Sequence, residues 1–298
     1  MEVKKLVISL IFCLYGVTVF SQDTQKYNLF EQAGYNFPYN ISKPDKSWEL
    51  PKKLVEISGL SYLDKYRVAC VQDEKGNIYI FNLMKGEIEK KIDFGNDGDY
   101  EGIELIDNDA WILKSNGTLY KVNDFLEGEG LRVKKYTTAL SGKNDAEGLA
   151  YDPVNKNLLI ACKGHPHIDK KEGKEFKAVY SFNEGTKLLD LDPFLLIEMD
   201  SIKKFKNYNT MATLGIELLA FFDSSKGDMS FQPSGMAIHP ISGNIYIIGS
   251  VGNLLIVFTR EGTMLAIVKL KSKIFPQPEG ICFNPDGVMY IANEGDED

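Results

Sequence analysis

One short phrase recurs five times in this chain and constrains its fold more than any other feature. Each copy has Glu or Ser, then Gly, then Leu, Ile or Met. The copies are SGLSYLD from Ser58, EGIELID from Glu101, EGLAYDP from Glu147, SGMAIHP from Ser234 and EGICFNP from Glu279. Aligned on their glycines, they are 43, 46, 87 and 45 residues apart. Repeats of about 40 to 50 residues are typical of β-propeller blades.

The segments between the phrases have the composition of short β-strands. The first four phrases are each followed by three further runs rich in Ile, Val, Tyr and Phe, which are separated by turns such as Lys75-Gly76-Asn77. A phrase and its three runs make four strands. We therefore predict an all-β fold, a β-propeller of four-stranded antiparallel blades.

The number of blades is less tightly constrained than their type. The fifth phrase is followed by one strand only, and we expect two N-terminal pieces, Tyr35 to Ile41 and Lys53 to Ile57, to complete that blade and close the ring. The 87-residue spacing indicates either a sixth blade without its phrase or an insertion. Because the C-terminal half of the stretch from Ile202 has helical spacing, we favour five blades with an insertion over residues 202–230.

The N-terminus has the features of an export signal. Lys4 and Lys5 precede an apolar run from Leu6 to Phe20, as in a secretory signal peptide. We predict a signal peptide over residues 1–21, an N-terminal segment over 22–49 and the propeller over 50–298. The protein is then exported to the periplasm or cell envelope. A retained membrane anchor is the alternative, although the run is shorter than the roughly 18 residues that spanning takes.

Charge and cysteine content narrow the partners. The net charge is -8, and it becomes -9 without residues 1–21, with 32 basic against 41 acidic residues. Such a surface repels nucleic acid, which we exclude as a partner, and favours cations and neutral or cationic ligands. Cys70, Cys162 and Cys282 each lie in an apolar run, so we expect buried free thiols.

The acidic residues of the phrase form a candidate cation site. The first strand of each propeller blade lines the central channel, so Glu101, Glu147 and Glu279 would converge there. Ser58 and Ser234 would complete this ring. Converging carboxylates repel one another, so we expect a cation between them, and Ca²⁺ suits a ring of oxygen ligands. In the plainer interpretation, the glycine permits a tight turn into the strand and the Glu or Ser bonds local backbone amides.

Other polar residues near the phrases could contribute to this site, although ordinary turn chemistry also explains them. Asp99 and Asp145 lie two residues before a phrase glutamate, and the second strands of the first and fifth repeats are followed by Asp73, Glu74, Asn293 and Glu294. His165 and His167 have a spacing that could bind a metal, but no Cys or His cluster accompanies them, so we interpret GHPH as a loop between strands.

Together these segments resemble a known family. The series LVEISGLSY, GDYEGIEL, DAEGLAYDP, SGMAIHP and QPEGICFNPDGVMYIANEG, which starts at about Leu50, resembles the SdiA-regulated proteins. The resemblance implies a β-propeller of the bacterial cell envelope, associated with the membrane at its periphery, without an agreed activity. A more distant resemblance to calcium-dependent lactonases of the gluconolactonase and paraoxonase type implies that Glu279, and by repeat symmetry Glu147 and Glu101, contact a central metal.

Two functions follow as expectations. The first is a binding module for an unknown small ligand or envelope protein, with a Ca²⁺ site in the channel. The alternative is a calcium-dependent hydrolase of lactones, esters or phosphoesters, for which the sequence identifies neither a base nor other catalytic residues.

Overall fold

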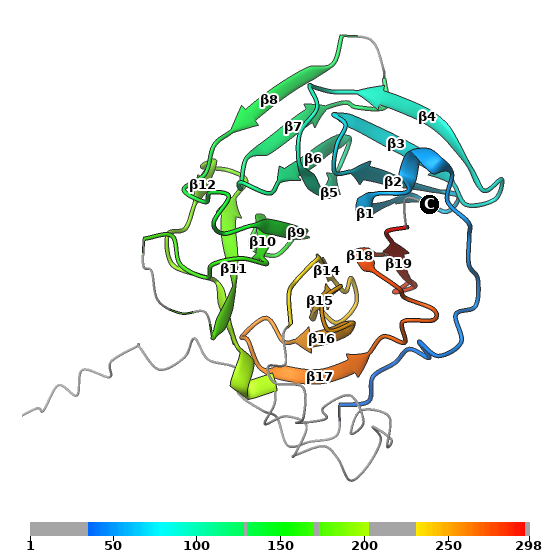
Figure 1. Ribbon diagram of the computed structural model, residues 1–298. Helices are drawn as coiled ribbons and strands as arrows, with labels where there is room; N and C mark the ends of the chain where they lie inside the picture. Colours follow the sequence, from blue (N-terminus) through cyan, green and yellow to red (C-terminus); the bar gives the residue numbers. More distant parts are fainter. Residues whose placement is uncertain (1–34, 128–129, 170–172, 174, 203–230, 296–298) are drawn as a thin grey trace, which may run out of the picture.

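The computed structural model describes residues 35–127, 130–169, 173, 175–202 and 231–295 (Figure 1). In this part of the chain, antiparallel sheets are arranged radially around a central axis. Helical structure is limited there to the 3-10 helix η2 (Lys52–Leu54) and a turn over residues 199–202. None of the described helices is long and apolar enough to cross a membrane. The architecture is the predicted all-β propeller.

Four blades have at least four strands, and in each the innermost strand comes first in the sequence. The first blade consists of β1 (Ile57–Asp64), β2 (Arg67–Gln72), β3 (Asn77–Asn82) and β4 (Glu87–Asp93). The second consists of β5 (Tyr100–Ile106), β6 (Asp109–Lys114), β7 (Leu119–Asn123) and β8 (Arg132–Tyr136). The third consists of β9 (Ala146–Asp152), β10 (Asn157–Cys162), β11 (Phe176–Asn183), β12 (Leu188–Leu189) and β13 (Leu195–Glu198). The fourth consists of β14 (Gly235–Ile238), β15 (Ile245–Gly249), β16 (Leu254–Phe258) and β17 (Met264–Lys269).

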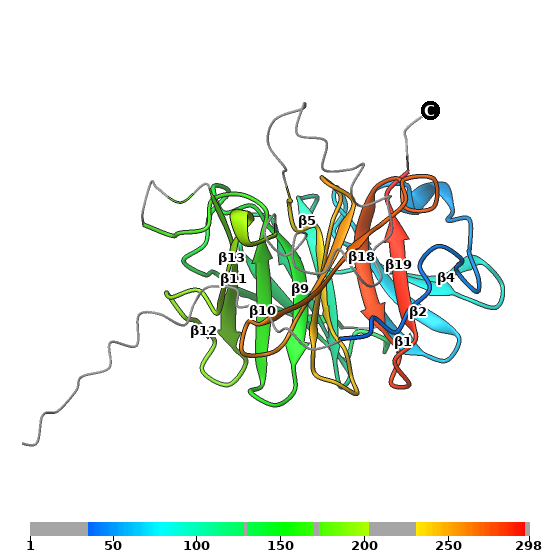
Figure 2. The same ribbon diagram turned by 90° about the horizontal axis from the view of Figure 1, so that it is seen from below.

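The fifth phrase opens a smaller sheet, which corrects the predicted number of blades. Only β18 (Pro278–Phe283) and β19 (Met289–Asn293) pair there. The described residues therefore form four blades and a two-stranded sheet, not five or six four-stranded blades. Figure 2 shows the ring from the side, with β18 starting at the upper face in this view.

The predicted N-terminal closing strands do not form either. Residues 35–51 contain no strand, and of Lys53 to Ile57 only Ile57 lies in one, at the start of β1. The segment instead packs through side chains: the Tyr39 hydroxyl donates to the Gly287 carbonyl at 2.6 Å, and the Trp48 indole donates to the Leu83 carbonyl at 2.7 Å. Pro38, Pro44 and Pro51 lack the N–H that ladder pairing needs.

The glycines of the phrase allow neighbouring innermost strands to approach closely. A Cβ atom added at any of them would lie no more than 3.0 Å from an atom of the next innermost strand. The contacts run from Gly59 to β5, Gly102 to β9, Gly148 to β14, Gly235 to β18 and Gly280 back to β1. This closes a ring of five innermost strands, in which β9 touches β14 directly. No innermost strand of a further blade therefore lies between β9 and β14 in this ring.

Burial between blades explains the composition of the strands. Each blade packs against a neighbour on both faces, so the middle of its second strand is a continuous apolar run rather than an alternating one. In β10 the five residues from Leu158 to Cys162 are all buried, and Trp111 of β6 packs against Phe182 of β11 in the adjacent blade. Each such fully buried side chain stabilises the fold by roughly 1.5–3 kcal/mol.

The remaining fold predictions have different outcomes. Cys70, Cys162 and Cys282 are buried free thiols, as predicted. The signal peptide over residues 1–21 lies outside the described residues. So does most of the insertion, residues 203–230.

Candidate functional site

The first residues of the innermost strands surround a cavity of about 360 Å³ at one mouth of the ring. It is lined by Ser58, Asp73, Glu101, Glu147, Lys163, Ser250, Val251, Pro276, Gln277, Glu279 and Glu294. Beneath it lies a second cavity of only about 10 Å³. The residues that follow the phrase glycines line this second cavity: Leu60, Ile103, Leu149, Met236 and Ile281. The Leu, Ile or Met of each phrase thus forms the floor of the cavity.

The acidic residues are aimed into the cavity by β-bulges. In β5 the register shifts between Tyr100 and Gly102, which leaves Glu101 without a partner in β6. The same irregularity occurs at Glu147 in β9, at Glu279 in β18 and at Ser58 in β1. A bulge inserts one extra residue and redirects its side chain. Here it turns the phrase's first residue toward the mouth of the ring.

A second ring of residues comes from the second strands. The partners of the phrase glycines are Val71, Leu113, Ala161, Ile248 and Ala292. Two positions after each partner lie Asp73, Ser115, Lys163, Ser250 and Glu294. Four of these five line the cavity. Sequence inspection found Asp73 and Glu294 but missed Lys163, Ser115 and Ser250, which become visible only when the repeats are aligned on strand register.

Four of the five residues predicted to form the ring line the cavity: Ser58, Glu101, Glu147 and Glu279. Ser234 is buried beside it, where its hydroxyl donates to the Pro278 carbonyl at 2.6 Å and accepts from the Ser250 amide at 3.1 Å. Ser234 therefore links β14 to β18.

Glu147 is paired with Lys163, the one basic residue among the described residues of the cavity lining. Lys163 Nζ lies 3.0 Å from Glu147 Oε1, and the Glu147 side chain is 6% exposed. Burial raises the pKa of Glu147, although the Lys163 ammonium opposes this. Burial would lower the pKa of Lys163, but the negative charges of Glu147, Asp145 and Glu279 outweigh it and raise that pKa.

Glu101 lies among other acids. Burial, the charge of Glu147 and a hydrogen bond with Asp99 raise its pKa, and it also shares a hydrogen bond with Glu147. Asp99 in turn accepts a hydrogen bond from the Ser115 hydroxyl. The contact between the two carboxyl groups raises the pKa of Glu101 and lowers that of Glu147, so a proton at this pair is held more readily by Glu101.

Glu279 and Asp73 complete the acidic wall. Burial, together with the charge of Glu147, raises the pKa of Glu279 to about 7, while a hydrogen bond from Ser250 opposes the shift. Burial also raises the pKa of Asp73, whose Oδ1 is buried without a hydrogen-bond partner among the described residues. Glu294 accepts a hydrogen bond from the Gln277 amide.

The donor set fits a hard cation in chemistry, since carboxylate and hydroxyl oxygens are the ligands that Ca²⁺ prefers. The orphaned oxygen of Asp73 is a further donor. Within the described ranges, however, no three His, Cys, Asp or Glu side chains are grouped closely enough to hold a metal ion as they stand. The Lys163 ammonium lies against Glu147 instead.

The other residues named from the sequence are not in the cavity lining. Asp99 contributes to the raised pKa of the lining residue Glu101, and Asp145 to that of Glu147. Glu74 and Asn293 are neighbours in sequence of the lining residues Asp73 and Glu294. His165 and His167 belong to a loop, and their backbone carbonyls accept hydrogen bonds from Asn144 Nδ2 at 3.0 and 3.2 Å.

Comparisons with solved structures give only distant similarities. A chain of the nidogen/laminin complex shares 12% identity at a TM-score of 0.45, over 80% of this chain and 72% of its own. Virginiamycin B lyase from Staphylococcus aureus shares 12% identity at a TM-score of 0.44, over 82% of this chain and 65% of its own. A protein of unknown function from Bacteroides thetaiotaomicron shares 12% identity at a TM-score of 0.49, over 80% of this chain and 52% of its own. At these values the similarities say nothing about function.

The sequence comparisons are more direct. No curated protein matches the chain. A family model described as SdiA-regulated matches residues 39–296, which include all four blades, the two-stranded sheet and every residue of the cavity lining. This chain therefore belongs to the SdiA-regulated family.

Proposed function

We propose that this protein is a binding module that takes a cation at the mouth of its propeller. The observation that supports this most is the charge imbalance of one cavity. Among the described residues that line it, five have carboxyl groups, Asp73, Glu101, Glu147, Glu279 and Glu294, and one, Lys163, has an ammonium group. Glu147 and Glu279 are only 5% and 7% exposed. Ionised carboxylates at such depth are costly unless a proton or a cation compensates them.

Calcium is the first candidate cation. Glu101, Glu147 and Glu279 would hold it, and Ser58 and Asp73 offer further oxygens from the same lining. Bound Ca²⁺ would neutralise carboxylates whose pKa burial raises. The cavity is also larger than a bare ion needs, because 360 Å³ leaves room for coordinating waters or a small organic ligand.

The setting of this function is the cell envelope. This proposal extends the predicted signal peptide, which would export the chain, and the excess of acidic over basic residues. A small ligand or another envelope protein could then reach the open mouth, and a peripheral association with the membrane is compatible with this location.

Calcium titration tests the proposal directly. After treatment with chelator, the protein should bind Ca²⁺ in isothermal titration calorimetry and melt at a higher temperature with calcium than without. Glu147→Gln should weaken binding at least about tenfold, because it removes one charged ligand. Glu184→Gln is the matched control, since Glu184 also pairs with a lysine but does not line the cavity. A parent protein with no binding heat and an unchanged melting temperature would refute the calcium site.

Hydrolysis is a second candidate, favoured by the pKa of Glu279 near 7. General acid–base catalysts work best when their pKa lies close to the working pH. We would screen lactones and aryl esters with and without calcium. Activity that survives replacement of Glu101, Glu147 and Glu279 together would place the chemistry elsewhere.

A further inference from the structure

Lys163 stands out in the second ring of the cavity. The equivalent positions on the other second strands are Asp73, Ser115, Ser250 and Glu294, and none of these is basic. Lys163 therefore departs from the repeat at the place where its ammonium group meets the carboxyl groups of the cavity lining.

The lysine is anchored by its backbone and loosely held by its side chain. Its amide donates to the Asp145 carbonyl at 2.7 Å, next to the phrase that contains Glu147. Its ammonium has one hydrogen-bond partner among the described residues, Glu147 Oε1 at 3.0 Å, and the side chain is 30% exposed. Two of its three N–H donors are thus left for the cavity.

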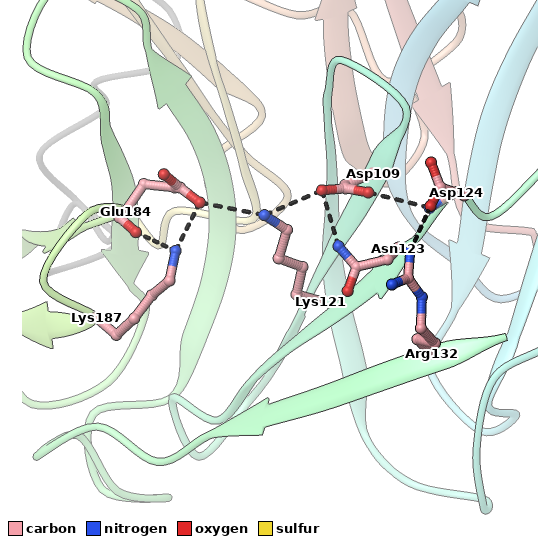
Figure 3. A network of polar contacts seen from close by, with 7 residues as sticks. All are labelled: Asp109, Lys121, Asn123, Asp124, Arg132, Glu184 and Lys187. Carbon is pink, nitrogen blue, oxygen red and sulfur yellow. Dashed lines mark hydrogen bonds and ion pairs between the residues drawn. The ribbon is translucent and has the colours of Figure 1, made fainter.

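Lys121 shows what a firmly held lysine looks like in the same protein. Its ammonium lies between two carboxylates, 3.0 Å from Asp109 and 3.2 Å from Glu184, and its side chain is 18% exposed (Figure 3). Compared with this arrangement, Lys163 can leave Glu147 by rotations of its four-carbon stem, without any change in the backbone.

We infer that Lys163 is an internal cation that competes with the ligand cation for Glu147. This inference rests on the proposed function. The ammonium neutralises Glu147 while the cavity is empty, and an incoming cation displaces it toward the open mouth. This accounts for the fact that the described acidic residues do not stand ready as a metal cage although four of the predicted residues share one cavity.

The competition would also make the site selective for charge. Replacing the ammonium with a monovalent cation leaves the charge next to Glu147 unchanged, so nothing is gained electrostatically. A divalent cation adds one positive charge among the five carboxyl groups of the lining, and this electrostatic gain offsets the cost of displacing the Lys163 ammonium. Lys163 is therefore predicted to favour divalent over monovalent cations and to lower the affinity for both.

The test compares Lys163→Met with the parent by calorimetric titration of Ca²⁺, and of Na⁺ in competition with Ca²⁺. We expect Lys163→Met to bind Ca²⁺ at least about tenfold more tightly, since one competing charge is removed. Sodium should compete measurably with calcium in this variant and not in the parent. Lys121→Met is the matched control and should leave calcium affinity unchanged. Lys163→Gln, which keeps an N–H donor for Glu147, provides the same measurement if the Met variant unfolds in chelator.

The outcomes separate this inference from the proposed function. If the parent binds Ca²⁺ and Lys163→Met and Lys163→Gln bind it equally or more weakly, Lys163 is no competitor and the inference is overturned while the calcium site stands. If neither the parent nor the Lys163 variants bind Ca²⁺, the calcium site is refuted and the inference with it.

Discussion

Two clusters of charged residues at opposite ends of the second and third blades show how differently one protein can treat its carboxylates. At the mouth, the described part of the cavity lining holds five carboxyl groups and one lysine. At the far end of the β5–β6 hairpin, the network in Figure 3 has three acids, Asp109, Asp124 and Glu184, and three bases, Lys121, Lys187 and Arg132. The first cluster is unbalanced and the second is neutral.

The balanced network connects two blades. Lys121 of β7 bridges Asp109, at the start of β6, to Glu184, in the turn after β11. Burial would raise the pKa of Asp109 and of Glu184, but hydrogen bonds from lysines and backbone reverse this and lower both. Each carboxylate is stable as an anion, so this network needs no further ligand.

The mouth has the opposite electrostatics. Burial raises the pKa of Glu101, Glu147 and Glu279, and the Lys163 ammonium and a hydrogen bond from Ser250 oppose this only in part. The paired charges between the blades therefore have a structural role. Buried carboxyl groups in excess over basic groups, by contrast, are stable only with bound protons or an added cation. The contrast distinguishes a structural ion network from a candidate site more clearly than residue type does.

The largest expected effect on stability comes from forcing two innermost strands apart at the mouth without changing a charged residue. A Cβ at Gly235 would collide with the Glu279 carbonyl oxygen of the next innermost strand. Gly235→Ala should therefore destabilise the protein by roughly 3 kcal/mol, since backbone cannot yield as a side chain can. Urea unfolding measures this. Gly142→Ala, where a Cβ meets nothing within 4 Å, should stay within about 0.5 kcal/mol of the parent.

The second prediction sets the pH responses of the two clusters against each other. Glu279 has a pKa raised from 4.5 to about 7, so the folded state holds this proton more tightly than the unfolded chain. Stability in chelator should fall by roughly 3 kcal/mol as pH rises through that interval, and Glu279→Gln should abolish this part of the slope. Chemical denaturation that gives the same free energy of unfolding at pH 5 and pH 7.5 would contradict this prediction.

Asp109 should behave in the opposite way. Its pKa is lowered below 3.8, so its contribution is present at neutral pH and is lost as pH falls below that value. Asp109→Asn should remove part of the loss of stability at acid pH. It should leave the pH dependence of the free energy of unfolding above pH 4.5 unchanged.

The sequence predicted the repeat because the repeat depends on local patterns. The phrase and its following strands identified the propeller. Glu101, Glu147 and Glu279 line one cavity, and their binding of a cation stays a prediction. What the sequence could not predict depends on pairing between distant segments. The bulge that aims Glu101 exists only relative to β6, and the glycine that seemed to serve a turn serves the approach of the next repeat.

The incomplete fifth sheet illustrates the same limit. Tyr35, Phe37, Tyr39 and Ile41 alternate with exposed residues as in a strand, so the period-two pattern was real. These side chains pack beside β15, β18 and β19 without forming a ladder. Periodicity reports which side chains are buried, and backbone pairing is a separate matter that Pro38 disfavours.

A third, smaller effect is expected from unbalancing the Figure 3 network. Lys121→Met keeps the packing against Trp111, whose ring centroid lies 5.3 Å from the ammonium, but leaves Asp109 and Glu184 with one cation fewer. Since Asp109 and Glu184 are 20% and 28% exposed, partial solvation limits the loss to about 1–2 kcal/mol. Adding Asp109→Asn and Glu184→Gln to Lys121→Met should restore part of it. A Lys121→Met variant as stable as the parent in urea would show that the network does not hold the blades together.

The smallest effect is expected at the edge of the same network, where Arg132 Nη2 lies 2.7 Å from Asp124 Oδ2. The geometry is as close as that of the Lys163–Glu147 pair at the mouth, yet the Arg132 side chain is 72% exposed and Asp124 is 36% exposed. Water already solvates both charges, so Arg132→Ala should change the free energy of unfolding by no more than about 0.5 kcal/mol, and added salt should not enlarge the difference. Urea unfolding at low and high salt measures this. A loss as large as that of Lys121→Met would mean that separation alone determines the strength of these pairs, and the distinction between the exposed edge and the buried mouth would fail.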